Sequence, residues 1–218
     1  MTANLTDAPA TGSVPAQDAT TDRPDTTEGP RLTLPAARSA ALLRIGLGLI
    51  YLWAFFSQGF GIVYSNRPAP PPGSPPAMAY AMQPDGAWHF SYDTSKGFIT
   101  SGFSHSPTSG YLSSNARGPL AFVPNSLPDK ANDTLWMFAL GGLGFALVLG
   151  IFSKIAGWGG LALNVLMWFS SFPNEFNPLL DGEHMIYGLV LVTLMYLRAG
   201  DHWGLGRWWR ARTPSLLH

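Results

Sequence analysis

The chain contains four apolar stretches, each close to the length that a lipid bilayer requires of a helix. Three of them hold no Asp, Glu, Lys or Arg, namely Ile45–Val63, Thr134–Phe152 and Ile155–Phe172. The fourth, Met185–Leu197, reaches the roughly 20 residues needed only if its helix begins at Pro178, with Asn177 as N-cap. The sequence therefore predicts an all-α membrane protein, a bundle of four transmembrane helices at about 45–63, 134–152, 155–172 and 178–197.

The basic residues that flank these stretches predict how the chain is oriented. They precede the first stretch, separate the second from the third and follow the fourth: Arg31, Arg38, Arg44, Lys154, Arg198, Arg207, Arg210 and Arg212. The short connection between the third and fourth stretches carries only the acidic residues Glu175, Asp181 and Glu183. Because short loops rich in Lys and Arg stay in the cytoplasm, we expect a multi-pass protein of the plasma membrane (N-in/C-in), with both termini cytoplasmic.

Three further regions surround the predicted spans. Residues 1–35 are rich in Thr, Ala, Asp and Pro, which predicts a disordered cytoplasmic tail. The membrane domain, residues 36–200, includes an extracytoplasmic loop at residues 64–133. Residues 201–218 hold three tryptophans among three arginines, a composition typical of a cytoplasmic interfacial anchor.

Composition excludes several kinds of chemistry. The chain has no cysteine, so disulfides, thiolate nucleophiles and Fe–S ligation are ruled out. Charged residues make up 12% of the chain and its net charge is zero, so a nucleic acid is not an expected partner. His89, His105 and His184 are scattered without ligand spacing, and no metal site is predicted.

The long loop begins with a proline-rich spacer and continues with aromatic residues. Trp88, Phe90 and Tyr92 alternate with His89 and Ser91, which predicts one short strand. A connection of this length in a compact protein is usually a lid or a docking surface. The aromatic residues favour a folded cap, and the alternative is a flexible loop with a few interfacial rings.

Small residues recur every four positions on two of the predicted spans. The second span has Gly142, Ala146 and Gly150 at this spacing, and the third has Ala156, Gly160 and Asn164. Small residues allow helix backbones to approach closely within a membrane. The pattern therefore predicts a tightly packed bundle.

The fourth span carries the polar residues that best fit a chemical site. Asp181, His184 and Tyr187 are three residues apart and share one helical face. A carboxylate one turn from a histidine fixes the imidazole tautomer and suits it to accept a proton, as the oxidation of a quinol requires. This stripe is therefore a candidate quinone site. Alternatively, Asp181 and Glu183 only complement the positive end of the helix, with His184 at the interface.

Two amides lie within the other apolar stretches. Gln58 falls in the outer half of the first span, at a depth similar to that of His184, and Asn164 falls near the midplane of the third. Gln58 is a candidate polar wall of the quinone site. The alternative for both amides is a hydrogen bond to a neighbouring helix.

Several segments resemble the DoxX/DoxD-like membrane proteins over about residues 38–209. These segments are Arg44–Ala54, Ser106-Pro107-Thr108 through Gly118-Pro119, Asn177-Pro178 to Asp181 with His184 and Tyr187, and Gly204–Trp209. The resemblance implies a four-helix membrane protein connected with sulfur or thiol redox chemistry. DoxD-like members are associated with thiosulfate:quinone oxidoreductase, and Asn177, Asp181, His184 and Tyr187 fall on the family's fourth-helix motif.

The chain also departs from this family. Relatives commonly have an Asp-Lys pair near the outer end of the first helix, where this chain has Ser57-Gln58. The resemblance then leaves Arg117 in the loop as a compensating positive charge for an anionic substrate. The outer loop is also longer and richer in proline than in the family.

Two functions follow as hypotheses. In the first, the chain is a membrane subunit of a quinone-linked redox system, with thiosulfate as a candidate electron donor and quinone as its cofactor. His184 would accept the proton, Asp181 would orient it, and Tyr187, Gln58, Asn177 and Arg117 would bind quinone or substrate. In the second, the chain is a non-catalytic scaffold or assembly factor of a respiratory complex. Membrane lipid and further redox subunits are the expected partners in both.

Overall fold

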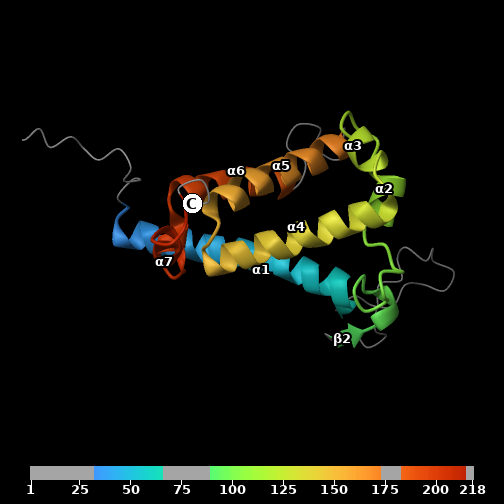
Figure 1. Ribbon diagram of the computed structural model, residues 1–218, viewed down its shortest axis with the longest axis horizontal. Coiled ribbons are helices and arrows are strands. Elements are labelled where there is room, and N and C mark those ends of the chain that lie inside the picture. Colours follow the sequence, from blue (N-terminus) through green and yellow to red (C-terminus); the bar gives the residue numbers. More distant parts are fainter. Residues whose placement is uncertain (1–31, 66–88, 173–182, 215–218) are drawn as a thin grey trace, which may run out of the picture.

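The computed structural model describes residues 32–65, 89–172 and 183–214, most of which are helical (Figure 1). Its long helices are α1 (Leu34–Phe60), α4 (Asp129–Leu149), α5 (Ser153–Ser171) and α6 (Glu183–Tyr196). Each predicted apolar stretch overlaps one of them, which confirms the helical part of the predicted fold. Among the described residues, α1 and α4 are long and apolar enough to cross a bilayer, and the apolar helix at 184–196 is shorter.

The first helix differs from its predicted boundaries at both ends. It begins at Leu34, with Pro35 in its first turn, so residues 34 and 35 are helical and not part of a disordered tail. Four alanines in the next two turns explain this extension, because alanine has the highest helix propensity. The helix ends at Phe60 because Gly61 adopts a left-handed φ of 72°, a common helix stop. The predicted N-cap of the fourth span, Asn177, lies outside the described residues.

The helices pack as two antiparallel pairs. Helix α1 lies along α4, and α5 lies along α6, while the contact between α4 and α5 is less extensive (Figure 1). Within each pair a glycine permits close approach. A Cβ atom on Gly144 would come within 2.7 Å of Leu52, and one on Gly160 within 2.5 Å of Leu191.

The predicted tight packing holds for the small residues of α5 and fails for Gly142 of α4. Ala156 and Gly160 are buried, as expected. Gly142, however, has no atom within 4 Å of an added Cβ, and it faces open space. Gly150 serves as the left-handed C-cap of α4, with a φ of 73°. Residue spacing alone does not distinguish these uses of glycine.

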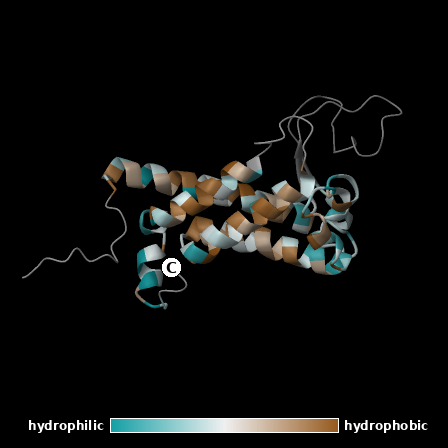
Figure 2. Cartoon of the chain, turned by 90° about the horizontal axis from the view of Figure 1, so that it is seen from above, coloured by the Kyte–Doolittle hydropathy of each residue, from teal (hydrophilic) through white to brown (hydrophobic). Residues whose placement is uncertain are grey.

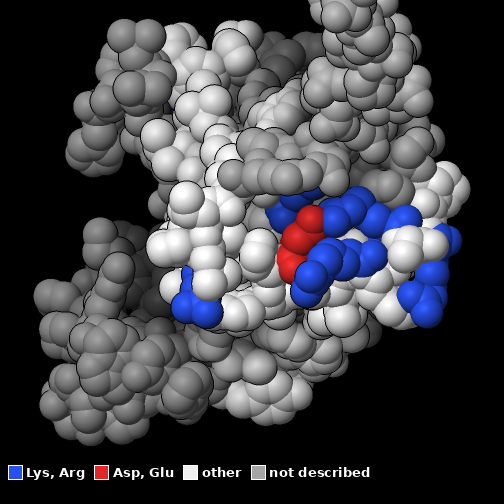
Figure 3. Space-filling view, turned by 90° about the vertical axis from the view of Figure 1, so that its left-hand side faces the viewer, with Lys and Arg blue, Asp and Glu red and all other residues white. Residues whose placement is uncertain are grey.

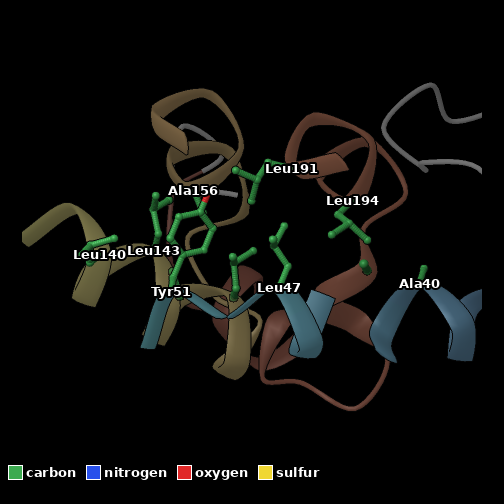
Figure 4. Packing of buried hydrophobic residues seen from close by; sticks show 11 residues of the cluster. Ala40, Leu47, Tyr51, Leu140, Leu143, Ala156, Leu191 and Leu194 are labelled. Carbon is green, nitrogen blue, oxygen red and sulfur yellow. The ribbon is translucent and has the colours of Figure 1, made fainter. Parts of the chain in front are cut away.

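The apolar core lies where the two pairs meet. Leu47 and Tyr51 of α1, Leu140 and Leu143 of α4, and Leu191 of α6 form one buried cluster (Figure 4). Apolar residues also cover much of the outside of the helices, whereas hydrophilic residues gather toward the two ends of the bundle (Figure 2). Exposed leucines, isoleucines and aromatic rings along all four helices are typical of contact with lipid.

One end of the bundle carries a folded cap, which we define as residues 89–128. Strand β2 (His89–Tyr92) pairs antiparallel with β1 (Ile62–Ser65), which confirms the predicted short strand. The remaining elements of the cap are η2 (Thr94–Lys96), α2 (Ser109–Ser114) and α3 (Phe122–Asn125). We call this end of the bundle the cap end.

The opposite end is strongly basic, and we call it the basic end. It holds the start of α1, the turn between α4 and α5, and the segments η3 (Ala199–Asp201) and α7 (Gly206–Arg210) (Figure 1). Among the described residues it carries seven basic side chains and a single acidic one, Asp201. Figure 3 shows lysines and arginines gathered around this acid, which pairs with Arg210. The two ends of the bundle therefore differ sharply in charge.

Candidate functional site

A small polar cluster lies inside the apolar bundle, and it joins the two helix pairs. Asn164 of α5 is only 3% exposed, and its Nδ2 donates to the hydroxyl of Tyr51 on α1 at 2.8 Å. The same nitrogen donates to the carbonyl of Gly160, one turn earlier, at 2.7 Å. This confirms that Asn164 bonds a neighbouring helix. Because the Tyr51 hydroxyl accepts from Asn164, its own hydrogen points elsewhere and can be donated.

The predicted stripe on the fourth span contributes to this cluster from α6. The ring of Tyr187 meets that of Tyr51 edge to face, with centroids 6.4 Å apart and an interplanar angle of 64°. Tyr187 also packs against the buried apolar cluster. His184 lies three residues before it, on the same helical face, and is partly buried. The structure thus brings Tyr187 and Tyr51 together, with His184 one turn closer to the cap end.

The predicted polar wall, Gln58, has a partner on another helix. Its Oε1 accepts a hydrogen bond from the indole nitrogen of Trp136 on α4 at 2.6 Å. The interhelical interpretation of this glutamine is therefore confirmed. Gln58 retains its amide donors for a second contact.

The other predicted site residues are not placed in the cluster. Asn177 and Asp181 lie outside the described residues, so their positions stay predictions. Arg117 lies on the cap with an exposed side chain, between α2 and α3. Within the described residues there is no group of three His, Cys, Asp or Glu side chains that could hold a metal ion.

A buried aspartate near the start of α4 has a structural role that was not predicted from the sequence. Asp133 is 3% exposed, and its Oδ1 accepts hydrogen bonds from the Ser106 hydroxyl at 2.8 Å and the Thr108 hydroxyl at 2.7 Å. It also accepts from the Thr108 backbone N–H at 3.2 Å. The Ser-Pro-Thr segment was visible in the sequence as a motif, but its partner was not. Asp133 fastens this part of the cap to α4.

The cap is also fastened to the end of α5. The Tyr111 hydroxyl donates to the carbonyl of Met167 at 3.0 Å, and the Gly118 N–H donates to that of Ser170 at 2.7 Å. A Cβ on Gly118 would lie 2.1 Å from the carbonyl oxygen of Phe169, so only glycine fits here. Burial raises the pKa of the Tyr111 phenol above its usual value. The cap therefore bridges the two helix pairs.

At the basic end, the burial of Arg44 was not predicted from the sequence. Arg44 of α1 is 3% exposed, and its guanidinium donates to the backbone carbonyls of Leu147 and Val148 at the end of α4. It also donates to those of His202 and Trp203, at 3.3 and 3.0 Å. The sequence signal was a lone arginine at the very edge of an apolar stretch. Its side chain therefore links α1 to the end of α4 and to the segment before α7.

The bundle therefore has a polar cluster in its interior, a folded cap at one end and the buried Arg44 at the basic end. The cluster offers a phenol donor, an amide and a nearby imidazole within apolar surroundings. Such groups suit a neutral ligand with carbonyl oxygens and an apolar body. No family model, curated protein or solved structure matches this chain.

Proposed function

We propose that the chain is an integral membrane protein with four spans and that it acts as a subunit of a quinone-linked redox system. The apolar lengths of α1 and α4 support membrane insertion. The start of α1 and helix α7 lie at the same end of the bundle (Figure 1), as an even number of crossings requires. The seven basic residues of that end support its placement in the cytoplasm.

The observation that carries the redox proposal is that Tyr51, inside an apolar bundle, hydrogen-bonds buried Asn164 and packs its ring against that of Tyr187. Polar groups at membrane depth are costly, and they commonly mark sites of function. A quinone would find the Tyr51 hydroxyl as a hydrogen-bond donor for a carbonyl oxygen here and apolar walls for its ring. His184, one turn away toward the cap end, would exchange the protons that accompany reduction and oxidation.

Thiosulfate is the electron donor that the resemblance indicates. Two thiosulfate ions together lose two electrons and join through a new S–S bond as tetrathionate. The quinone gains these two electrons and two protons. We place the donor at the cap end, where Arg117 is an exposed positive charge.

The experiment is to extract detergent-purified protein for bound quinone and to follow the quinone spectrum on addition of thiosulfate. We expect bound quinone that becomes reduced, and a loss of that reduction in His184→Ala and Tyr187→Phe. Tyr196→Phe is the matched control, because Tyr196 is on the same helix and is 61% exposed. Full quinone reduction by folded His184→Ala protein would remove the assignment of His184.

A second function, a membrane scaffold for a redox complex, is favoured by the surface of the cap. Tyr92, Phe103 and Phe122 are each more than half exposed there. Exposed aromatic rings on a folded surface are typical of protein interfaces. Phe103→Ser with Phe122→Ser should then abolish co-purification of partner subunits, while the exposed control Ser113→Ala keeps it. A quinone-free, unreactive protein would also favour this function.

A further inference from the structure

An apolar groove runs along the outside of the bundle where α4 and α5 meet. It encloses about 510 Å³, which is within the range of about 300–1,000 Å³ in which proteins hold ligands. Phe138, Gly142 and Phe145 line it on α4, and Ile155 and Gly159 line it on α5. An added Cβ on Gly142 or on Gly159 would meet no atom within 4 Å, so both glycines form an open floor.

The groove has the length and the depth of one leaflet of a bilayer. Its lining extends along α4 from Phe138 to the turn at Ile151, about 20 Å at the helical rise. One leaflet, with its headgroup region, is about half of a bilayer thickness of about 40–45 Å. The groove starts at the basic end and stops before the cap, so it lies at the depth of the leaflet next to the basic end.

The basic end borders the mouth of the groove. Phe152, which lines the groove, packs against Trp209 of α7 with ring centroids 4.3 Å apart. Lys154 is exposed and directly precedes the groove residue Ile155. Arg212 lies over the ring of Trp208, 4.6 Å from its centroid, and is also exposed. A ligand in the groove therefore lies next to cationic side chains at the basic end.

We propose that this groove binds an anionic membrane phospholipid, with an acyl chain between α4 and α5 and its phosphate at the basic end. The inference rests on the membrane insertion in the proposed function, and it is independent of the redox chemistry. An acyl chain matches the apolar lining, and a phosphate matches Lys154, next to the groove residue Ile155, and Arg212, which follows α7 at the same end. A second copy of the chain in the same orientation would instead bring two basic ends side by side, which is repulsive.

The test uses full-length protein in phosphatidylcholine bilayers that contain a trace of spin-labelled lipid. Electron paramagnetic resonance then measures the fraction of that lipid whose acyl chain is immobilised. We expect more immobilisation of phosphatidylglycerol than of phosphatidylcholine. Gly142→Leu and Gly159→Leu fill the groove and should lose this immobilised fraction, whereas Gly46→Leu, at an open position of α1, should keep it.

The charge of the rim is tested separately. Lys154→Gln should lower the preference for phosphatidylglycerol about fivefold, the effect of one basic side chain near an anionic surface. Arg38→Gln is the matched control, because Arg38 is exposed at the same end but on α1, which does not line the groove. It should leave the preference unchanged.

Three outcomes would overturn the inference. Protein that does not float with the vesicles would refute membrane insertion and with it the proposed function. Inserted protein with equal immobilisation of both lipids, or with the same immobilisation in Gly142→Leu as in the unaltered chain, would refute the lipid site alone. A dimer that dissociates in Gly142→Leu would assign the groove to a second copy.

Discussion

A buried charged side chain lies near each end of helix α4. The two side chains bind different parts of the molecule. At its carboxyl end the guanidinium of Arg44 donates only to backbone carbonyls, from α4 and from the segment before α7. Near its amino end Asp133 accepts mainly from the hydroxyls of Ser106 and Thr108. Each charge also has the sign that the helix dipole favours at that end.

This difference indicates that the two ends have different roles. Arg44 belongs to α1, so it ties a main helix to the backbone of another main helix and to the chain that follows α6. Asp133 ties a main helix to the cap alone. We therefore expect substitution of Arg44 at the basic end to destabilise the whole bundle. Substitution of Asp133 at the cap end should unfold only a local segment of the cap.

The largest expected effect is that of Arg44→Met. The substitution removes the buried cation and leaves carbonyls at the end of α4 without a donor, a loss of about 3 kcal/mol in the free energy of unfolding. Thermal unfolding in detergent, followed by circular dichroism, measures this. Arg44→Lys should recover only part of the loss, because an ammonium cannot reach two pairs of carbonyls as a guanidinium does.

Arg38→Met is the control for this experiment. Arg38 lies on the same helix and is exposed, so its substitution should change the unfolding free energy by less than about 0.5 kcal/mol. Equal unfolding temperatures for the two methionine variants would contradict the role given to Arg44.

Asp133→Ala should give a smaller and more local effect. It leaves the buried Thr108 N–H and two hydroxyls without their acceptor, at a cost of about 2 kcal/mol. We expect faster hydrogen exchange and proteolysis in residues 101–128, with little change in α5 and α6. Asp129→Ala, at an exposed position one turn earlier, is the control. Global destabilisation as large as that of Arg44→Met would erase the contrast between the two ends.

The sequence predicted the helices because each needs only local information. Apolar length and the breaks between stretches located all four, and alternation located β2. The partners of Arg44 and Asp133 could not be predicted, since Arg44 reaches carbonyls more than a hundred residues away. Any of several polar groups at the ends of the apolar stretches could have been a hydrogen-bond partner. Only the packing of α1 on α4 selects among them.

The polar cluster was predictable in part. Tyr187 was named because it shares a helical face with His184, and Asn164 because an amide at membrane depth needs a partner. The contribution of Tyr51 was not foreseen, because a tyrosine in an apolar stretch is equally common at an interface. Its role depends on which face of α1 meets α5 and α6, and this follows from tertiary packing.

The hydrogen bond between Tyr51 and Asn164, in the middle of the bundle, can be compared with the contacts at its two ends. Tyr51→Phe removes the hydrogen bond with Asn164 but keeps the ring contact with Tyr187. Interhelical hydrogen bonds in membranes contribute about 0.6–2 kcal/mol. For the proposed membrane bundle we therefore expect a loss near the lower bound, shared by all four helices. Thermal unfolding measures it, with Tyr196→Phe as the exposed control. A loss as large as that of Arg44→Met would show that the centre of the bundle contributes as much to its stability as the basic end does.

The smallest expected effect is a pH dependence confined to the cap. Burial raises the pKa of Tyr111, so the folded cap holds the phenol proton more tightly than the unfolded cap does. This contribution to stability is fully present below the pKa of about 10 of an unfolded tyrosine and is lost as the pH rises through the higher folded value. Amide hydrogen exchange of residues 109–120 is measured at rising pH and corrected for the intrinsic exchange rate. It should show that this part of the cap opens selectively above a pH of about 10. In Tyr111→Phe this extra opening should vanish, because no phenol remains to ionise, while the contacts of Asp133 keep the rest of the cap in place. Opening that persists in Tyr111→Phe would contradict its assignment to this phenol. Opening that spreads to the basic end would show that the two ends are not independent.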